Sequence, residues 1–257
     1  MTPPPPHIYN QTRDTQCTAL HSTVWKIVDE LRGSVDGWDF KMYVLGFLFY
    51  RFISENLAEH INANMRECGE IDFDYTHLSD EEAIKDNDIK ENIISQKGFF
   101  IMPSELFINV LQTHKSDTTN LNATLSNVFR NIESSSIGTK SENDFKGLFN
   151  DIDVNSSANL GESSLIKRNE KLYKVMEEIS KLDLDYSDNA IDAFGDAYVY
   201  LMRMYAGSAG KSGGEFFTPQ EVSHLLARLV SYGKQSVIKS MTQPVGAAHC
   251  FYNLLKC

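Results

Sequence analysis

Apolar residues recur at intervals of three and four along much of the chain, which is the pattern of amphipathic helices. The strongest such stretch covers residues 38–66, and between Met42 and Phe49 it is apolar on nearly all sides. A helix that is apolar all round belongs in the middle of a bundle. We therefore expect residues 38–66 to form the central helix of a helical domain.

The same spacing predicts further helices before and after this one. The longer predicted helices cover residues 18–32, 104–112, 120–133, 164–181 and 189–205, and shorter ones cover residues 79–85 and 88–96. Ser104 is placed to cap the helix that begins there. We expect residues 98–103 to be a short extended segment and residues 155–161 to be a polar loop of the kind that links units.

A loop rich in glycine and serine at residues 207–214 leads into two adjacent phenylalanines and an abrupt helix start. Thr218 and Glu221 have the T-x-x-E spacing of a capping box, and Pro219 takes the first helical position, where its missing N–H costs nothing. An apolar stripe follows at helical spacing, made of Val222, Leu225, Leu226, Leu229 and Val230. Taken alone, this pattern indicates a flexible loop before a well-capped helix. The loop is not a phosphate loop, because Tyr205 stands where that motif requires its first glycine.

Two long phrases of the sequence resemble one protein family. Residues 210–230, GKSGGEFFTPQEVSHLLARLV, closely resemble the start of the methyltransferase domain in the modification (HsdM) subunits of type I restriction systems. Residues 31–55, LRGSVDGWDFKMYVLGFLFYRFISE, resemble the N-terminal helical domain of the same subunits. Together the resemblance covers residues 18–237.

The resemblance implies a mainly α chain, in which a helical N-terminal domain precedes the truncated start of an α/β, Rossmann-like methyltransferase domain. The expected parts are a disordered N-terminus at residues 1–17, the helical domain at 18–170, the start of the N6-adenine methyltransferase domain at 171–237 and an aberrant tail at 238–257. Because the sheet of the methyltransferase domain would be absent, we expect the apolar stripe after Pro219 to lie exposed or to cause aggregation.

In this family an [EQ]-[FY]-F-T-P-[RQ] turn packs on S-adenosylmethionine and holds its amino-acid end. The resemblance therefore implies that the cofactor-binding residues here are Glu215, Phe216, Phe217, Thr218, Pro219 and Gln220. The chemistry agrees, because a helix N-terminus offers unpaired N–H groups and a positive dipole end to a carboxylate.

Residues 238–253 depart from the family pattern. There the family has a D-P-x-x-G-[ST]-[AG]-[GS] turn that binds the methionine part of the cofactor, whereas this segment contains no aspartate. A reading frame that takes the last base of each codon and the first two of the next encodes aspartate from Met241-Thr242 and leucine at two later places. The remaining codons permit K-V-Y-D-P-A-C-G. We therefore expect a one-base deletion near codon 238 that shifted the frame before translation ended at Cys257.

In the family, adenine N6 is methylated after the base is flipped out of the duplex, and an [ND]-P-P-[FY] motif grips its exocyclic amine. That motif is absent from the 257 residues, so we assign no catalytic residue and expect no methyl transfer and at most weak cofactor binding. The resemblance implies a sequence-specificity subunit, a second modification subunit and, in restriction assemblies, a translocating restriction subunit as partners, with DNA contacted through the complex. The alternative interpretation is a helical interaction module that docks on a protein or DNA without chemistry of its own.

The composition is that of an acidic globular protein, with a net charge of −11 and 42% hydrophobic residues. This charge disfavours a DNA-binding domain that acts alone, since contacts to phosphates need clustered Lys and Arg. No run approaches the ~20 apolar residues of a membrane span, and the proline-rich N-terminus does not have the pattern of a secretory signal. The four cysteines show neither C-x-x-C pairing nor histidine partners at metal spacing. We therefore expect a cytoplasmic protein with reduced cysteines, no metal site and no membrane contact.

Overall fold

The computed structural model describes residues 39–85, 87–160, 162–182 and 195–201, together with single residues or pairs between 18 and 25 and between 222 and 229. The secondary structure of these described residues is helical and includes no strand. The chain divides into two compact units, Met1–Tyr198 and Val199–Cys257. The disordered N-terminus expected at residues 1–17 and the aberrant tail expected at 238–257 lie outside the described residues.

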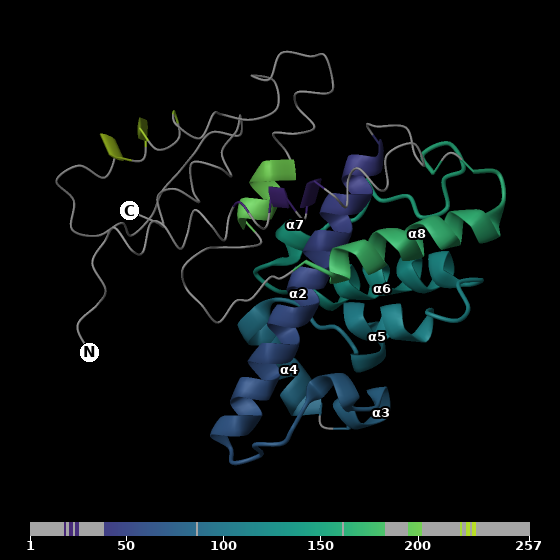
Figure 1. Ribbon diagram of the computed structural model, residues 1–257. Helices are drawn as coiled ribbons and strands as arrows, with labels where there is room; N and C mark the ends of the chain where they lie inside the picture. Colours follow the sequence, from purple (N-terminus) through teal and green to yellow (C-terminus); the bar gives the residue numbers. More distant parts are fainter. Residues whose placement is uncertain are drawn as a thin grey trace. The chain divides into compact units, whose positions relative to one another are not determined.

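Helix α2, Asp39–Glu67, is the centre of the first unit and confirms the helix predicted at residues 38–66 (Figure 1). Its apolar stretch is buried as expected. Four large side chains there are at most 1% exposed: Tyr43, Phe47, Leu48 and Tyr50. Gly46 allows the helix to approach Ile152, because a Cβ atom at that position would lie 1.8 Å from Ile152 Cδ1. The core of the unit therefore surrounds α2.

Three helices lie on one side of α2 in Figure 1. They are α5 at Phe107–Thr113, α6 at Leu121–Ser135 and α8 at Leu165–Ser180. Both α5 and α8 contact α2, and α6 packs against α8. The helices predicted at 120–133 and 164–181 are confirmed. The apolar face of α6 is buried along its whole length, through Leu121, Leu125, Val128, Phe129 and Ile132.

The start of α5 differs from the prediction. Leu106 is its N-cap residue, and a 3₁₀ helix, η2 at Pro103–Glu105, precedes it. Ser104, which we expected to cap the helix, instead donates its hydroxyl to Asp80 Oδ2 at 2.5 Å and its N–H to Asp80 Oδ1 at 2.9 Å. The prediction of a Ser104 cap is wrong, because the side chain joins two distant segments.

Shorter elements cover the ends of this core. They are η1 at Tyr75–His77, α3 at Asp80–Ala83, α4 at Asn87–Lys97 and α7 at Glu142–Phe145. The helices predicted at 79–85 and 88–96 are confirmed, and Ser79 and Glu82 form a capping box at the start of α3. Residues 99–102 are not helical, in agreement with the predicted extended segment, and the first three of them are buried.

Aromatic rings join α2 to the elements around it. Phe129 of α6 stacks on Phe149 with ring centroids 4.3 Å apart. Tyr50 of α2 meets Phe129 and Phe107 edge-on, at centroid distances of 5.6 and 5.5 Å. Each such pair adds about 0.5–1.5 kcal/mol beyond the burial of its area. One tyrosine of α2 thus holds α5 and α6 in place together.

The described part of the predicted polar loop, residues 155–160, lies within the first unit and does not link the two units. Leu160 in this segment and Val154 just before it are buried. Asn122 Nδ2 of α6 donates to Asn155 Oδ1 at 2.6 Å. The domain boundary expected at residue 170 falls inside α8, and the whole of this helix lies within the first unit.

Buried tyrosine hydroxyls donate to backbone carbonyl oxygens in the connecting segments. The pairs are Tyr43 with Asp153 at 2.6 Å, Tyr50 with Glu105, and Tyr75 with Ile101 at 2.8 Å. An unpaired buried hydroxyl or carbonyl would cost about 1–3 kcal/mol, so these bonds select the paths of the segments that supply the carbonyls. Burial raises the pKa of the Tyr50 and Tyr75 hydroxyls, which keeps them protonated donors.

Glu105 has a carboxyl group that is partly buried beside this network. Burial raises the pKa of Glu105, and the negative charge of Asp80 raises it further. Asn131 Nδ2 donates to Glu105 Oε1 and opposes this shift without cancelling it. A raised pKa in the folded state means that the contribution of Glu105 to stability is fully present below the unfolded pKa and is lost as pH rises through the folded pKa.

We expect Leu125→Ala to lower the free energy of unfolding by about 2–5 kcal/mol, because it removes a side chain that is 0% exposed in the core. The measurement is urea unfolding followed by circular dichroism. Asn127→Ala, at an exposed position of the same helix, is the matched control and should change the free energy by no more than about 0.5 kcal/mol. Equal effects of the two changes would contradict the packing described for α6.

We expect Glu105→Gln to raise Tm at neutral pH, because glutamine keeps the acceptor for Asn131 and removes the partly buried charge. The difference from the parent protein should shrink as the pH falls and vanish below the ordinary value of 4.5, where the parent carboxyl is protonated in both states. Thermal unfolding at a series of pH values measures this difference. Glu170→Gln, at an exposed position of α8, is the control. A constant difference at all pH values would contradict the raised pKa.

Candidate functional site

The six residues predicted to bind the cofactor lie outside the described residues. They are Glu215, Phe216, Phe217, Thr218, Pro219 and Gln220. The structure therefore does not test whether they form a binding turn, and their assignment stays a prediction. The helix expected after them is helical at every described position, namely residues 222, 225, 226, 228 and 229.

The apolar stripe of this helix is exposed, as expected. The exposed fractions are 44% for Val222, 58% for Leu225, 44% for Leu226 and 64% for Leu229. Amphipathic helices normally bury such a stripe against a partner element. The stripe is therefore an apolar surface, and it follows the predicted cofactor turn in the sequence.

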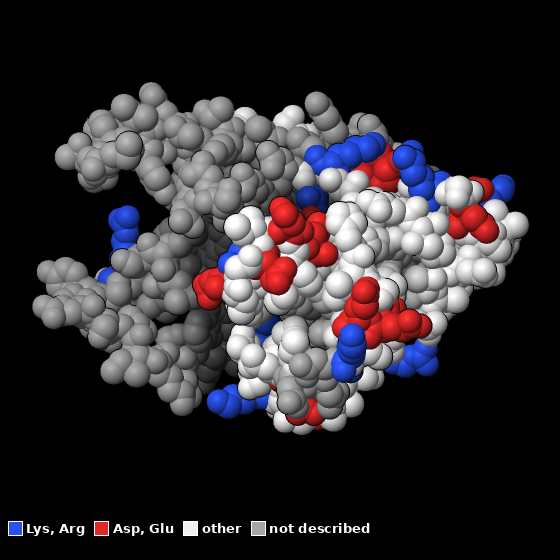
Figure 2. Space-filling model, turned by 90° about the horizontal axis from the view of Figure 1, so that it is seen from below, with Lys and Arg blue, Asp and Glu red and all other residues white. Residues whose placement is uncertain are grey.

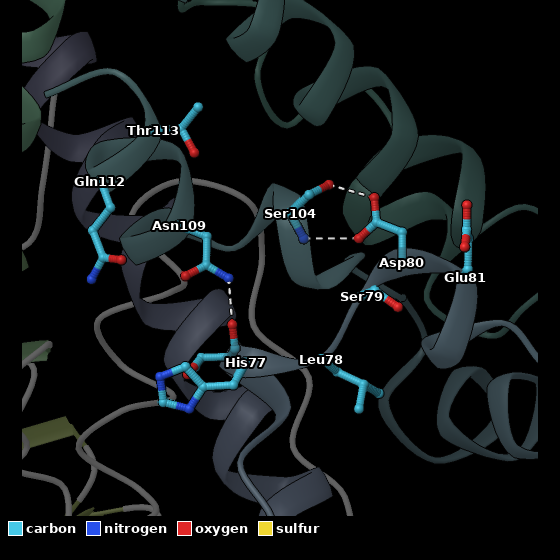
Figure 3. Close-up of a pocket in the computed structure, with 10 residues that line it drawn as sticks. His77, Leu78, Ser79, Asp80, Glu81, Ser104, Asn109, Gln112 and Thr113 are labelled. Atoms are coloured by element: carbon cyan, nitrogen blue, oxygen red, sulfur yellow. Dashed lines mark hydrogen bonds between the residues drawn. The ribbon is translucent and has the colours of Figure 1, made fainter. Parts of the chain in front are cut away.

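In the first unit, a polar pocket of about 650 Å³ opens between η1, α3, η2 and α5 (Figure 3). Its walls carry hydroxyl, amide, imidazole and carboxylate groups. The side chains with such groups belong to Thr76, His77, Ser79, Asp80, Glu81, Ser104, Asn109, Gln112 and Thr113. The pocket was not predicted from the sequence, because the residues that form it come from four separate elements.

Hydrogen bonds between elements hold the walls of this pocket together (Figure 3). Asp80 of α3 accepts both the hydroxyl and the N–H of Ser104 from η2. Asn109 Nδ2 of α5 donates to the carbonyl oxygens of Thr76 at 2.7 Å and Pro103 at 2.8 Å. Each bond joins a side chain to the backbone or side chain of another element, so these polar groups have a structural role.

The serine, histidine and carboxylate groups of the pocket do not form a nucleophile and its base. His77 Nδ1 lies 3.3 Å from Asp74 Oδ2, and its side chain is 84% exposed. Both serine hydroxyls donate to carboxylates that also accept a backbone N–H of the same serine. The Ser79 pair is a capping box, and the Ser104 pair joins two distant segments, so both have structural roles. Nucleophilic catalysis needs a hydroxyl within hydrogen-bond reach of a base that is itself oriented for proton transfer. We assign no catalytic residue to the pocket.

The carboxyl group of Asp74, which lies in the chain just before this pocket's first lining residue, has a lowered pKa with a structural explanation. Burial alone would raise the pKa of Asp74, but hydrogen bonds from the N–H and hydroxyl of Thr76 and the charge of His77 lower it overall. Asp74 is the N-cap residue of η1, and its side chain accepts the Thr76 N–H. The lowered pKa therefore results from capping, and a perturbed pKa is evidence for a functional site only when no such structural cause exists.

The surface of the described part shows charges of both signs. On the face seen in Figure 2, acidic and basic side chains are interspersed, and no continuous basic stripe crosses the described residues. No group of three or more His, Cys, Asp or Glu among the described residues could hold a metal ion. Within the described part of the chain, no helix combines the length and the apolar character needed to cross a membrane.

Two family models match consecutive parts of the chain. Residues 20–179 match the HsdM N-terminal domain, and residues 189–251 match N-6 DNA Methylase. The first match ends at the end of α8, which is later than the boundary that we expected at residue 170. The second match continues beyond residue 237 and includes most of the segment that we expected to depart from the family.

Individual relatives agree with these matches. The chain is 45% identical over 250 residues to the type I restriction enzyme MpnII methylase subunit of Mycoplasma pneumoniae, an alignment that covers 95% of this chain and 45% of the relative. It is also similar to the crystal structure of the type I restriction-modification system methyltransferase subunit from Streptococcus thermophilus, with a TM-score of 0.73 and 26% sequence identity. That comparison covers 93% of this chain and 50% of the other.

The chain thus spans about half the length of the relatives that it matches. The HsdM N-terminal domain accounts for more than half of its residues and for the whole helical core around α2. On this basis the chain belongs to the family of type I restriction-modification methylase subunits.

Proposed function

We propose that this chain corresponds to the first part of a modification subunit that, as a whole protein, methylates adenine N6 in DNA with S-adenosylmethionine. The observation that carries the proposal is the order of the two family matches, with the HsdM N-terminal domain at residues 20–179 followed by N-6 DNA Methylase at 189–251. A helical module that only docks on a partner would not require a methyltransferase sequence after its helical domain. The two matches together therefore favour a methyltransferase subunit.

In this proposal the first unit is a rigid support for a cytoplasmic complex. Its core is closed around α2, and the polar bonds across its pocket are structural. The unit assembles with a sequence-specificity subunit and a second modification subunit, and a restriction subunit joins them in restriction assemblies. DNA is contacted through the complex. The net charge of −11 supports this arrangement, because a chain so acidic gains little from contact with phosphates by itself.

We assign the cofactor-binding turn to Glu215, Phe216, Phe217, Thr218, Pro219 and Gln220. These residues lie inside the N-6 DNA Methylase match and directly before the helix whose described residues begin at Val222. The N-terminus of that helix offers N–H groups to the carboxylate of the cofactor. A Rossmann-like sheet would supply the opposite wall of such a pocket.

By itself, the 257-residue polypeptide is proposed to be inactive. Its sequence contains neither the [ND]-P-P-[FY] motif that grips the adenine amine nor the D-P-x-x-G turn that binds the methionine part of the cofactor. The exposed stripe at Val222, Leu225, Leu226 and Leu229 supports this proposal, since a complete domain would cover these side chains.

The frame shift near codon 238 remains our hypothesis for the departure of residues 238–253 from the family turn. In its favour, the shifted frame must encode aspartate at Met241-Thr242, where the family turn requires it. The N-6 DNA Methylase match counts against the hypothesis. It extends through residue 251 and so includes most of the segment that a frame shift would have altered.

The alternative function, an interaction module without chemistry, is supported by the described core, which is closed and has no catalytic group. For this polypeptide the two proposals agree that no methyl is transferred. They differ on bare DNA, because an independent DNA-binding module would bind duplex with an affinity that falls steeply with salt concentration. A modification subunit instead depends on its specificity subunit.

Calorimetric titration of S-adenosylmethionine into the polypeptide should show no binding tighter than about 1 mM, because the turn at Thr218 provides only one side of the pocket. Thr218→Ala is the matched variant, and its titration should be indistinguishable from that of the parent protein. A tight binding curve in the parent protein would refute the proposed inactivity. If Thr218→Ala abolished that binding, the turn would still be assigned correctly.

Sequencing the coding DNA over codons 236–258 tests the frame shift and the proposed function together. We expect a second frame that stays open and encodes D-P-x-x-G at the position of Met241-Thr242, and a read extended downstream should show [ND]-P-P-[FY] in the same frame. Such a frame is expected only of a methyltransferase gene. A second frame that is closed by a stop codon within a few triplets would sink the frame-shift hypothesis and favour the interaction module.

A further inference from the structure

Arg51 of α2 donates hydrogen bonds to the C-terminal end of α8. Arg51 Nη1 donates to the carbonyl oxygens of Ile179 at 2.6 Å and Leu182 at 2.8 Å. Arg51 Nε donates to Glu55 Oε1 at 2.6 Å, one turn further along α2. The arginine thus joins one carboxylate of α2 to two backbone carbonyls at the end of α8.

These contacts satisfy groups that a helix end leaves unpaired. The last four carbonyl oxygens of a helix have no partner within the helix, and a positive charge near them also opposes the negative end of the helix dipole. At this end of α8, the backbone N–H of Lys181 donates to Glu178 and that of Leu182 donates to Ile179, both at 3.2 Å. Arg51 adds a further donor to the carbonyl oxygen of Ile179 and donates to that of Leu182.

Burial distinguishes Arg51 from Arg66, which also forms an ion pair on α2. The side chains of Arg51 and Glu55 are 11% and 37% exposed, whereas those of Arg66 and Glu59 are 48% and 66% exposed. Exposed pairs contribute little to stability, but hydrogen bonds from a buried charged group are roughly twice as strong as those between neutral groups. A planar guanidinium can also direct several N–H groups at once, which a lysine ammonium cannot do in the same geometry.

The position of this contact along the chain gives it a further role. Leu182 is buried and follows α8, and the N-6 DNA Methylase match begins at residue 189. We propose that Arg51, held by Glu55, is a positioning residue that fixes the end of α8 and thereby the point at which the chain leaves the helical domain for the methyltransferase domain. The identity of the following domain rests on the proposed function, while the anchoring itself rests on the contacts of Arg51.

The body of α8 does not depend on Arg51. Leu172, Val175 and Met176 are each at most 3% exposed and keep the helix packed on its neighbours. Loss of the arginine should therefore release the last turn of α8 and leave the rest of the helix in place. The test therefore compares local opening at the end of α8 with local opening in its middle.

Cleavage by trypsin reports local opening at the end and in the middle of α8 separately. Lys181 is the C-cap residue, and Lys174 lies in the middle of the helix. A protease cuts a folded chain only where the backbone opens locally, so the cleavage rate reports local opening. We compare the parent protein with Arg51→Met. This change introduces an apolar side chain of similar length and removes all the N–H donors of the arginine side chain. Mass spectrometry follows the peptides that end at Lys181 and at Lys174.

We expect the rate of cleavage after Lys181, relative to that after Lys174, to rise about tenfold in Arg51→Met. Arg66→Met removes an exposed arginine from the same helix and should leave this ratio unchanged within about twofold. Arg51→Lys should give an intermediate ratio, because one ammonium replaces the guanidinium fork. It also serves as the second variant if Arg51→Met does not fold.

An unchanged ratio in Arg51→Met and Arg51→Lys would overturn the proposal, whether both cleavage rates rise together or neither rises. Equal rises would mean that Arg51 supports only the general stability of the unit. The test does not involve S-adenosylmethionine or DNA. Failure of the proposed function would therefore leave the anchoring result intact, and failure of the anchoring would leave the proposed function untouched.

Discussion

The burial of α2 on more than one side is the constraint on which the rest of the helical unit depends. A helix with apolar residues nearly all round cannot lie on a surface, so other segments must cover each of its sides. Here α5, α8 and the segment at Ile152 supply that cover, and Gly46 makes the last of these contacts close. The tyrosines of α2 extend the constraint, since their hydroxyls bond to particular carbonyl oxygens, one in η2 and one at Asp153.

The elements that could be predicted from the sequence are those whose signals are local. The buried face of α6 repeats every three or four residues, and the capping box of Ser79 and Glu82 spans a single turn. Ser104 has the same local character as a capping residue, yet it binds Asp80, which is 24 positions away in the chain. A distant partner of this kind competes with the local role, and no short pattern reveals it. For the same reason the segment 155–161 could be predicted as polar but not as part of the packed unit.

The parts of the candidate site also differ in whether they could be predicted from the sequence. The cofactor turn at residues 215–220 was identified through the resemblance to a family, and the capped helix after it was predicted from local spacing. The pocket near Asp80 and the anchor at Arg51 depend on contacts between elements, and the spacing of residues along the chain contains no sign of them. Arg51 lies just after the apolar stretch of α2, between Tyr50 and Phe52, and a charge between two aromatic residues of such a helix is the one signal that could have marked it. Physically, a charge among buried residues needs partners, and here the end of another helix provides them.

The exposed leucines after the predicted cofactor turn have a consequence inside a cell. Val222, Leu225, Leu226 and Leu229 present an apolar surface to the solvent. Chaperones bind surfaces of this kind, and proteases degrade the chains that keep them exposed. The abundance of this polypeptide should therefore be governed by its turnover more than by its rate of synthesis, even though the helical unit that precedes the stripe has a well-packed core.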